Sequence, residues 1–375
     1  MKHSDSLHAD LQAYLQKDLY PLHMPGHKRR FSCAGGLPFD LDLTEVPGTD
    51  DLHEAQDILK ASMERTAALF HAKRTWHLVN GSTLGNLAAL YAAVPFGGSI
   101  LCMEGCHRSI LHAAELLHLH IEWLIPPVIT PFEVAGSLSP SDVRKAFESG
   151  RSYHAVVLTS PTYEGVLADV SAIASICREY DVPLIVDQAH GAHLGLFPEC
   201  GFPESAVTQG ADLVIQSTHK TLPALTQTAL LHLCSDRIDP DAVEHALDVF
   251  ETSSPSYLLL LSIDECVRTL QKDGAALFAK WQDALYSFYD RVSSLRHLRV
   301  FSPQTQEEVF AADPGKILLY APMGGEALSQ LLRTRYGFEP EKVTAQTVLA
   351  MTSCMDTKEA LLRFADALLA IDNTL

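Results

Sequence analysis

The sequence has few basic residues and no long apolar run. Its 375 residues include 28 Lys and Arg against 46 Asp and Glu, which gives a formal net charge of −18. Nucleic acids and anionic membranes require a basic surface, so neither is an expected partner. No stretch of about 18 apolar residues is present, and the polar start Met1–His8 lacks the apolar segment of a signal peptide. We therefore expect a cytoplasmic protein that acts on a small molecule, and the acidic balance is compatible with a cationic one.

Cysteine pairs, dinucleotide motifs and hydrolase motifs are also missing. The eight cysteines are scattered and none forms a CxxC pair, which is typical of reduced, mostly buried thiols. Gly97 and Gly98 lack the GxGxxG spacing of a dinucleotide loop, and the GxSxG of a serine hydrolase is absent. His23 and His27 have a helical metal-ligand spacing, but the Pro-Gly between them prevents a regular helix. We expect no metal site.

Beyond residue 50, the sequence alternates strand and helix patterns. Continuous apolar runs at 99–103, 154–159, 182–187 and 211–217 predict buried strands, and they are separated by helical patterns at 84–93, 110–119 and 170–180. Such strands indicate a mainly parallel sheet covered by helices on both faces. A long helix over 263–295 precedes a second block, with strands at 316–320 and 347–351 and helices at 325–336 and 357–371. We expect an N-terminal arm at 1–50, a large α/β domain at 51–265, and a linking helix with a small α+β domain at 266–375.

Three polar groups follow the predicted strands or open a helix. Asp187 ends one strand, Lys220 follows the next strand after Ser-Thr-His, and Asn80-Gly81-Ser82-Thr83 opens a helix. Alone, each has an ordinary reading as a helix cap, an ion-pair partner or a surface charge. Together they are an imine-forming lysine, an acid for a pyridine nitrogen and a phosphate cradle. This combination indicates pyridoxal 5′-phosphate (PLP).

The sequence resembles the ornithine/lysine/arginine decarboxylases, a PLP family of fold type I. The resemblance is carried by short stretches that fall in order along the chain and cover residues 20 to 260 nearly continuously. These stretches are Pro21–Lys28, Asp42–Leu52, Asn80–Asn86, Cys106–Ser109, Ser160–Gly165, Val186–His193, Gln216–Lys220 and Thr252–Tyr257. The resemblance implies a seven-stranded, mainly parallel sheet with a small C-terminal α+β domain.

The resemblance also implies roles for single residues. Lys220 would carry the Schiff base, Asp187 would pair with the pyridine nitrogen, and His107 would stack on the ring. His190 would lie at the polar edge of the ring and share the catalytic work with these three. The remaining cofactor contacts are implied for Gly81, Ser82, Thr83, Ala189, Ser217, His219 and Thr252. Thr252 would act across the interface of a homodimer with shared active sites.

Two departures from the family leave the reaction open. Gln188 stands where an acid is common, and the sequence stops at Leu375, where family members usually continue into a further C-terminal domain. We therefore expect a short form of the family that decarboxylates ornithine, lysine or arginine to the amine and CO₂. Carboxylates that could bind the distal charge of such a substrate are Glu45, Asp50, Asp51 and Glu164. The alternatives are an aminotransferase or lyase, with Arg299, Arg333, Arg335 or Arg363 holding the carboxylate, and a PLP-binding homologue without turnover.

Overall fold

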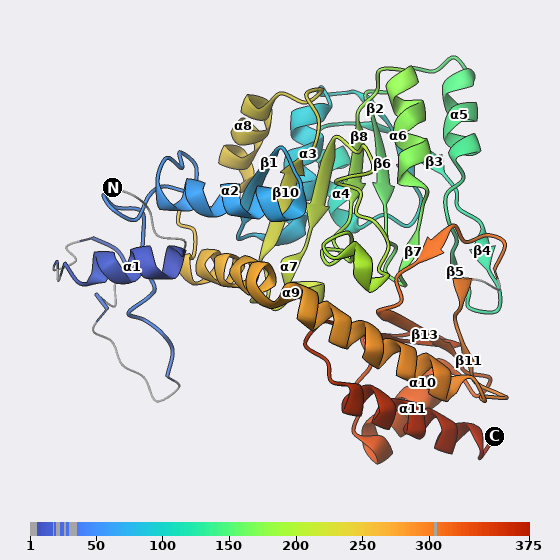
Figure 1. Cartoon of the computed structure of the whole chain (residues 1–375). Helices are drawn as coiled ribbons and strands as arrows, with labels where there is room; N and C mark the ends of the chain where they lie inside the picture. Colours follow the sequence, from blue (N-terminus) through green and yellow to red (C-terminus); the bar gives the residue numbers. More distant parts are fainter. Residues whose placement is uncertain (1–5, 18, 20–22, 26–27, 30–35, 304–305) are drawn as a thin grey trace.

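The structure is a computed structural model that describes residues 6–17, 19, 23–25, 28–29, 36–303 and 306–375. Its centre is a seven-stranded sheet in the order β1-β10-β9-β8-β6-β2-β3 (Figure 1). The strands are β1 (Arg74–Leu78), β2 (Ser99–Met103), β3 (His120–Leu124), β6 (Ala155–Thr159), β8 (Leu184–Asp187), β9 (Leu213–Gln216) and β10 (Ala229–Leu233). β10 is antiparallel to both of its neighbours, and the other pairs are parallel. The expected mainly parallel seven-stranded sheet is confirmed.

Helices cover both faces of this sheet because successive strand residues point to opposite sides. Ile100 and Cys102 of β2 pack in the core beneath α3 (Gly81–Ala93), α4 (Arg108–Leu116) and α8 (Pro240–Phe250). Leu101 and Met103 pack in a second core, beneath α5 (Pro140–Glu148) and α6 (Val170–Glu179). A sheet buried on both faces explains why its inner strands are continuously apolar in sequence.

A 36-residue helix, α9 (Tyr257–Val292), runs from the large sheet to the C-terminal block (Figure 1). That block holds a four-stranded antiparallel sheet of β11 (Arg299–Val300), β13 (Lys316–Tyr320), β15 (Thr347–Met351) and β14 (Lys342–Val343). Its helices are α10 (Gly325–Leu331), a π-helical turn (Leu332–Tyr336) and α11 (Lys358–Asp372), which packs along α9. Over the described parts of the chain, no helix has an apolar stretch long enough to cross a membrane. The division at residue 265 stays a prediction, and this position falls inside α9.

Two small sheets complete the fold. β4 (Val128–Ile129) pairs with β5 (Val134–Ala135), and β7 (Val166–Leu167) of the large α/β region pairs with β12 (Ala311–Ala312) of the C-terminal block. Short helical turns follow β8 and β9, at Pro198–Cys200 and α7 (Thr218–Thr221). The β7–β12 pair therefore joins the two parts of the chain beside the edge at which β6, β8 and β9 end.

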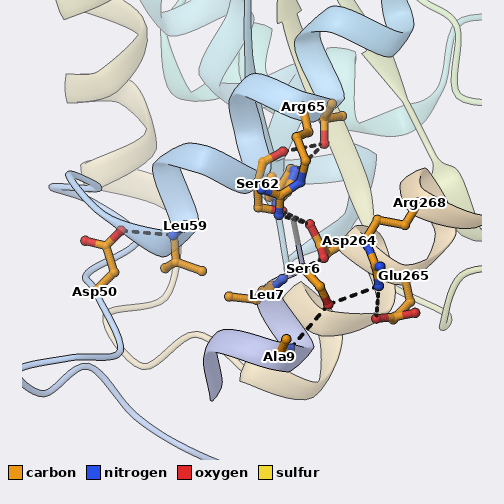
Figure 2. Close-up of polar contacts among 12 residues, drawn as sticks. Ser6, Leu7, Ala9, Asp50, Leu59, Ser62, Arg65, Asp264, Glu265 and Arg268 are labelled. Carbon is orange, nitrogen blue, oxygen red and sulfur yellow. Dashed lines mark hydrogen bonds and ion pairs between the residues drawn. The ribbon is translucent and has the colours of Figure 1, made fainter. Parts of the chain in front are cut away.

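A buried carboxylate fastens the N-terminal helices to α9. Asp264 of α9 is fully buried and accepts hydrogen bonds from the Leu7 backbone N–H (3.0 Å), Ser62 Oγ (2.5 Å) and Arg65 Nη2 (2.6 Å) (Figure 2). Leu7 opens α1 (Leu7–Leu15), and the other two donors lie on α2 (Ile58–Phe70). One side chain thus connects three helices that are far apart in sequence.

Candidate active site

The predicted site residues follow strands that run in the same direction. Asp187 ends β8, Ser217 follows β9, the Gly81 turn follows β1, and His107 follows β2 after a short loop. Because the carboxyl ends of parallel strands meet at one edge of a sheet, these residues gather there. This edge is the usual ligand site of an open α/β sheet.

Lys220 lies on the one-turn helix α7 and points at His190. Its Nζ atom is 2.9 Å from His190 Nε2. Burial lowers the pKa of the Lys220 ammonium, and the negative charges of Asp187 and Glu341 oppose this shift. The environment therefore shifts Lys220 toward the neutral amine that a nucleophilic lysine needs.

Asp187 is a buried carboxylate held by two donors. Its Oδ2 accepts a hydrogen bond from Asn86 Nδ2 (2.8 Å), and its Oδ1 accepts one from the backbone N–H of Ala189 (3.1 Å). Asn86 lies in the interior of α3 and also donates to Ser109 Oγ (2.9 Å). The sequence analysis did not single out Asn86, although a buried amide inside an apolar helix is a signal that it has a specific partner.

His107 caps the helix that follows β2. Its Nδ1 accepts the backbone N–H of Ser109 (3.2 Å) and lies 2.7 Å from Ser109 Oγ. Burial lowers the pKa of His107, against the opposing charge of Asp187. Because Nδ1 accepts, the neutral ring carries its proton on Nε2 and its orientation is fixed.

Hydroxyl groups gather at the start of α3. This helix begins at Gly81, whose φ of +74° favours glycine, and no described side chain caps its N-terminus. Ser217 Oγ donates to Ser82 Oγ at 2.9 Å, which brings the segment after β9 against the helix, and Thr83 follows with its side chain exposed. His219 Nδ1 donates to the Thr228 carbonyl (2.8 Å), so its Nε2 is the remaining acceptor. Hydroxyls and free N–H groups at a helix N-terminus are suited to an anion.

Thr252 does not join this group within the chain. Its carbonyl accepts a hydrogen bond from His53 Nε2 (3.1 Å), and its Oγ1 accepts the backbone N–H of Ser254 (3.2 Å). The Gln188 side chain also bonds within its own segment of the chain: it donates to the Gly191 carbonyl (3.0 Å) and accepts the Ala206 N–H (2.9 Å). A buried amide therefore stands where the family usually has an acid, and its donors and acceptors are satisfied inside the loop.

The arginines considered for a substrate carboxylate make contacts within the C-terminal block. Arg333 pairs with Glu339 (3.3 Å), Arg335 lies over the ring of Tyr336, and Arg363 lies over the ring of Phe338. Arg299 is an exposed residue of β11. These contacts give the four side chains no role at the sheet edge.

No metal centre is formed by the described side chains of His, Cys, Asp and Glu. His193 turns away from the sheet edge and packs against Phe202 and Trp281, with Nε2 3.1 Å from Asp313 Oδ1. His23 is described and His27 lies outside the described residues.

Lys316 is a site residue that the sequence analysis missed. It opens β13 in the C-terminal block, is 4% exposed, and places Nζ 3.3 Å from His190 Nδ1. Burial lowers the pKa of Lys316 to about 8, against the opposing charge of Asp313. Tyr163 closes the same region, with its ring centroid 4.3 Å from that of His190 and its hydroxyl donating to Glu341 (2.6 Å). A lysine directly before a continuous apolar strand was the available signal for Lys316.

The sheet, its helices and the lysine at its carboxyl edge define the fold-type-I class of PLP enzymes. Solved structures share this fold: the lysine decarboxylase LdcF of Francisella novicida (TM-score 0.83, 19% identity) matches 98% of this chain and 60% of its own. An alanine–glyoxylate aminotransferase from Nostoc sp. (TM-score 0.66, 16% identity) matches 86% of this chain and 88% of its own. At these identities the likeness shows the fold.

Within that class, the model of the family "Orn/Lys/Arg decarboxylase, major domain" matches residues 6–347, and the chain belongs to this family. The uncharacterized protein YaaO of Bacillus subtilis is 37% identical over 69% of this chain. An arginine decarboxylase of the same organism is 25% identical over 99% of this chain and 78% of its own length. The chain spans 55% of the length of YaaO. The predicted family and fold are confirmed.

Proposed function

We propose that the chain binds PLP covalently on Lys220 and decarboxylates ornithine, lysine or arginine to the amine and CO₂. The observation that carries the proposal is Lys220 Nζ at 2.9 Å from His190 on the edge where Asp187 ends its strand. Family membership and the named arginine and lysine decarboxylases among the relatives support the reaction and the basic substrate. We propose that the protein works in the cytoplasm; its described cysteines are free thiols, which fits a reducing compartment.

The residues present fit PLP by the chemistry of their donors and acceptors. The start of α3, where the Asn80 side chain makes no capping hydrogen bond, offers its backbone N–H groups and the Ser82 hydroxyl to a phosphate, and Ser217 holds that hydroxyl in place. His219 would donate as well only with a proton on Nε2, because the Thr228 carbonyl uses its Nδ1–H. Asp187 offers a buried carboxylate to a protonated ring nitrogen, and the small Ala189 beside it leaves room for the ring. His107, with its orientation fixed by Ser109, supplies a flat surface for stacking.

Each residue then has a task that its environment supports. PLP, when bound, supplies the electron sink for the bond that breaks at the substrate Cα. Asp187, held by Asn86, would pair with the ring nitrogen of the cofactor and keep it protonated. Lys220, as a neutral amine, would hold the cofactor, and its Nζ would carry the proton that is returned to the substrate Cα. His107 covers one face of the ring and excludes water from it.

The carboxylates considered for binding the distal charge of the substrate differ in the hydrogen bonds and ion pairs that they already make. Asp50 Oδ2 accepts the backbone N–H groups of Asp57 (2.8 Å) and Leu59 (3.0 Å) before and within the first turn of α2, and Glu45 Oε1 accepts that of Leu52 (2.9 Å). Asp51 Oδ1 likewise accepts the His53 N–H (2.9 Å). Glu164, which pairs with Lys342 (2.8 Å) beside Tyr163, stays the candidate nearest to His190.

We propose a homodimer with shared active sites, in which Thr252 reaches the cofactor phosphate of the other subunit. Thr252 contacts its own loop and His53, and its partial exposure leaves the side chain available to a second chain. Twofold symmetric dimers are the commonest assemblies of soluble enzymes.

Borohydride trapping and a substrate panel test the function. The PLP-loaded protein should yield, after reduction, a single labelled peptide that contains Lys220. Incubation with ornithine, lysine and arginine should give loss of CO₂ and the matching amine by mass spectrometry, and Lys220→Ala should lose both. Lys342→Ala, which removes a lysine from β14 of the C-terminal sheet, is the matched control and should keep the adduct. A reduced adduct on another lysine would end the assignment, keto acid products would favour an aminotransferase, and no product would favour a non-catalytic homologue.

A further inference from the structure

His190 lies between two lysines that come from different parts of the chain. Its Nε2 is 2.9 Å from Lys220 Nζ, and its Nδ1 is 3.3 Å from Lys316 Nζ. The ring is 8% exposed, and burial, followed by the charges of Lys316 and Lys220, holds the pKa of His190 far below its usual range. His190 is therefore a neutral imidazole with one N–H donor and one acceptor nitrogen.

A neutral imidazole cannot hydrogen-bond to two ammonium groups. Its acceptor nitrogen takes a hydrogen from one lysine, but its N–H needs a lone pair on the other. An ammonium group has no lone pair, so the second lysine must be the neutral amine. Hydrogen bonds at both distances therefore allow at most one positive charge on the pair of lysines.

The surroundings of Lys316 fit this shared charge. Its stem passes directly over Gly165, where a Cβ atom would lie 2.6 Å from Lys316 Cγ, so the glycine gives the buried side chain its path. The charged groups that face Lys316 are Asp313, Glu164, Glu341 and Lys220. Those that face Lys220 are Asp187 and Glu341, and His107 and His219 also face the His190 ring. Carboxylates on both sides can stabilise a single positive charge at either lysine, which makes its position adjustable.

We propose that Lys316 and Lys220 share one proton across His190, and that Lys316 takes this proton when Lys220 reacts as a neutral amine. In the transfer, a Lys220 Nζ–H bond breaks while His190 Nε2–H forms, and His190 Nδ1–H breaks while Lys316 Nζ–H forms. Lys220 is left neutral, Lys316 becomes an ammonium, and His190 changes tautomer without a net charge. Lys316 is a positioning residue, because it acts on Lys220 through the imidazole. The role given to this transfer in the reaction of Lys220 rests on the proposed function. The shared proton itself is a property of the protein without PLP.

Competitive acylation of the full chain, freed of cofactor, measures this proton directly. Acetic anhydride reacts with neutral amines, so the pH dependence of labelling at Lys220, read by peptide mass spectrometry, reports its protonation. In Lys316→Met, Lys220 loses its proton acceptor, and its labelling at pH 7 should fall about fivefold, with the profile moving to higher pH. In Lys316→Arg the cation locks His190 Nδ1 as the acceptor, so labelling of Lys220 should be kept or increased. Lys358→Met, which removes an exposed lysine of α11 that pairs with Asp283 outside this cluster, should leave the profile unchanged.

A nitrogen-15 spectrum of the histidine rings gives a second readout, with the signal of His190 assigned from His190→Gln. The ring should move to the Nδ1–H tautomer in Lys316→Met and to the Nε2–H tautomer in Lys316→Arg. A tautomer and a labelling profile that do not respond to residue 316 in folded variants would overturn the proposal. If a substitution at residue 316 unfolds the chain, the nitrogen-15 spectrum of the wild-type protein still tests the proposal. A His190 ring protonated on both nitrogens at neutral pH would contradict the shared proton. Neither readout requires PLP or turnover, so failure of the proposed function would leave this test standing.

Discussion

At the scale of single residues, Asn86 connects Asp187, the proposed partner of the ring nitrogen, with His107, the proposed stacking residue. One amide donates to Asp187 and to Ser109, and Ser109 in turn orients His107. A hydrogen bond to a charged group is worth about 1.5–3 kcal/mol. The position of the Asp187 carboxylate therefore depends on a residue that meets no ligand itself.

We expect Asn86→Ala to keep PLP on Lys220 but to lower turnover about 10–100-fold, because Asp187 loses the donor at its Oδ2. Ser109→Ala is the matched variant: it releases His107 but leaves the Asn86–Asp187 contact, so its loss should be smaller. Steady-state kinetics with the best substrate of the panel, together with the visible spectrum of the bound cofactor, measure both. Wild-type turnover in Asn86→Ala would show that Asp187 is oriented by its other contacts.

At the scale of secondary-structure elements, α9 holds the N-terminal helices through a buried charge. Asp264 is fully buried, while Arg65, its ionic partner, is 19% exposed. Removing the Asp264 carboxylate would leave the Arg65 charge without its ionic partner. It would also leave the Leu7 N–H and the Ser62 hydroxyl without their acceptor. The stability of α1 and α2 should therefore be sensitive to this one side chain.

Asp264→Ala should lower the free energy of unfolding by about 3–5 kcal/mol, measured by urea denaturation. Limited proteolysis should cut first in α1, because its opening N–H is no longer tied to α9. The control is Asp283→Ala on the same helix, where the pair with Lys358 is largely exposed; there the change should stay within about 1 kcal/mol. Equal effects of the two substitutions would refute a special role for the buried carboxylate.

The strands of the two sheets also show how far the sequence predicts the fold. The strands at 99–103, 316–320 and 347–351 were predicted with their observed bounds, because they are uninterrupted apolar runs. β1 and β10 were not predicted: β1 contains Arg74, Thr75 and His77, and His232 interrupts β10, so neither has that pattern. The buried His232 lies with Nδ1 2.8 Å from Thr75 Oγ1, and the buried His77 lies with Nε2 2.8 Å from Thr66 Oγ1. Only the antiparallel pairing and α2 create these contacts.

The candidate site was predictable where its residues follow strands in short motifs. Asp187 and the Ser-Thr-His-Lys segment lie within a few residues of a strand end, so the parallel sheet alone brings them together. Lys316 is 96 residues from Lys220 and belongs to another sheet. Its place beside His190 depends on how the two parts of the chain pack, which no local pattern specifies.

At the scale of the whole molecule, the proposed homodimer assigns Thr252 to the site of the other subunit, and among the described residues Thr252 contacts His53 and its own loop. Mixing inactive variants tests this. Lys220→Ala and Thr252→Ala, dissociated together and reassembled, should recover about a quarter of the wild-type activity at limiting PLP, because half of the dimers are mixed and each has one intact site. Lys220→Ala mixed with Asp187→Ala is the control and should recover none, since both residues serve the same site from one chain. No recovery with Thr252→Ala, or an active monomer by light scattering, would contradict the shared site.

The two-residue pairing of β7 with β12 has a mechanical consequence. β7 begins one residue after Gly165, and β12 ends one residue before Asp313, whose N–H donates to the Gly165 carbonyl (2.8 Å). Lys316 lies three residues after Asp313, so a shift of the C-terminal sheet relative to this pairing would change the 3.3 Å distance between Lys316 Nζ and His190 Nδ1. A hydrogen bond of that length is lost with about half an ångström of further separation. Under the proposed proton sharing, the junction between the two sheets would therefore couple the alignment of the C-terminal sheet to the charge on Lys220.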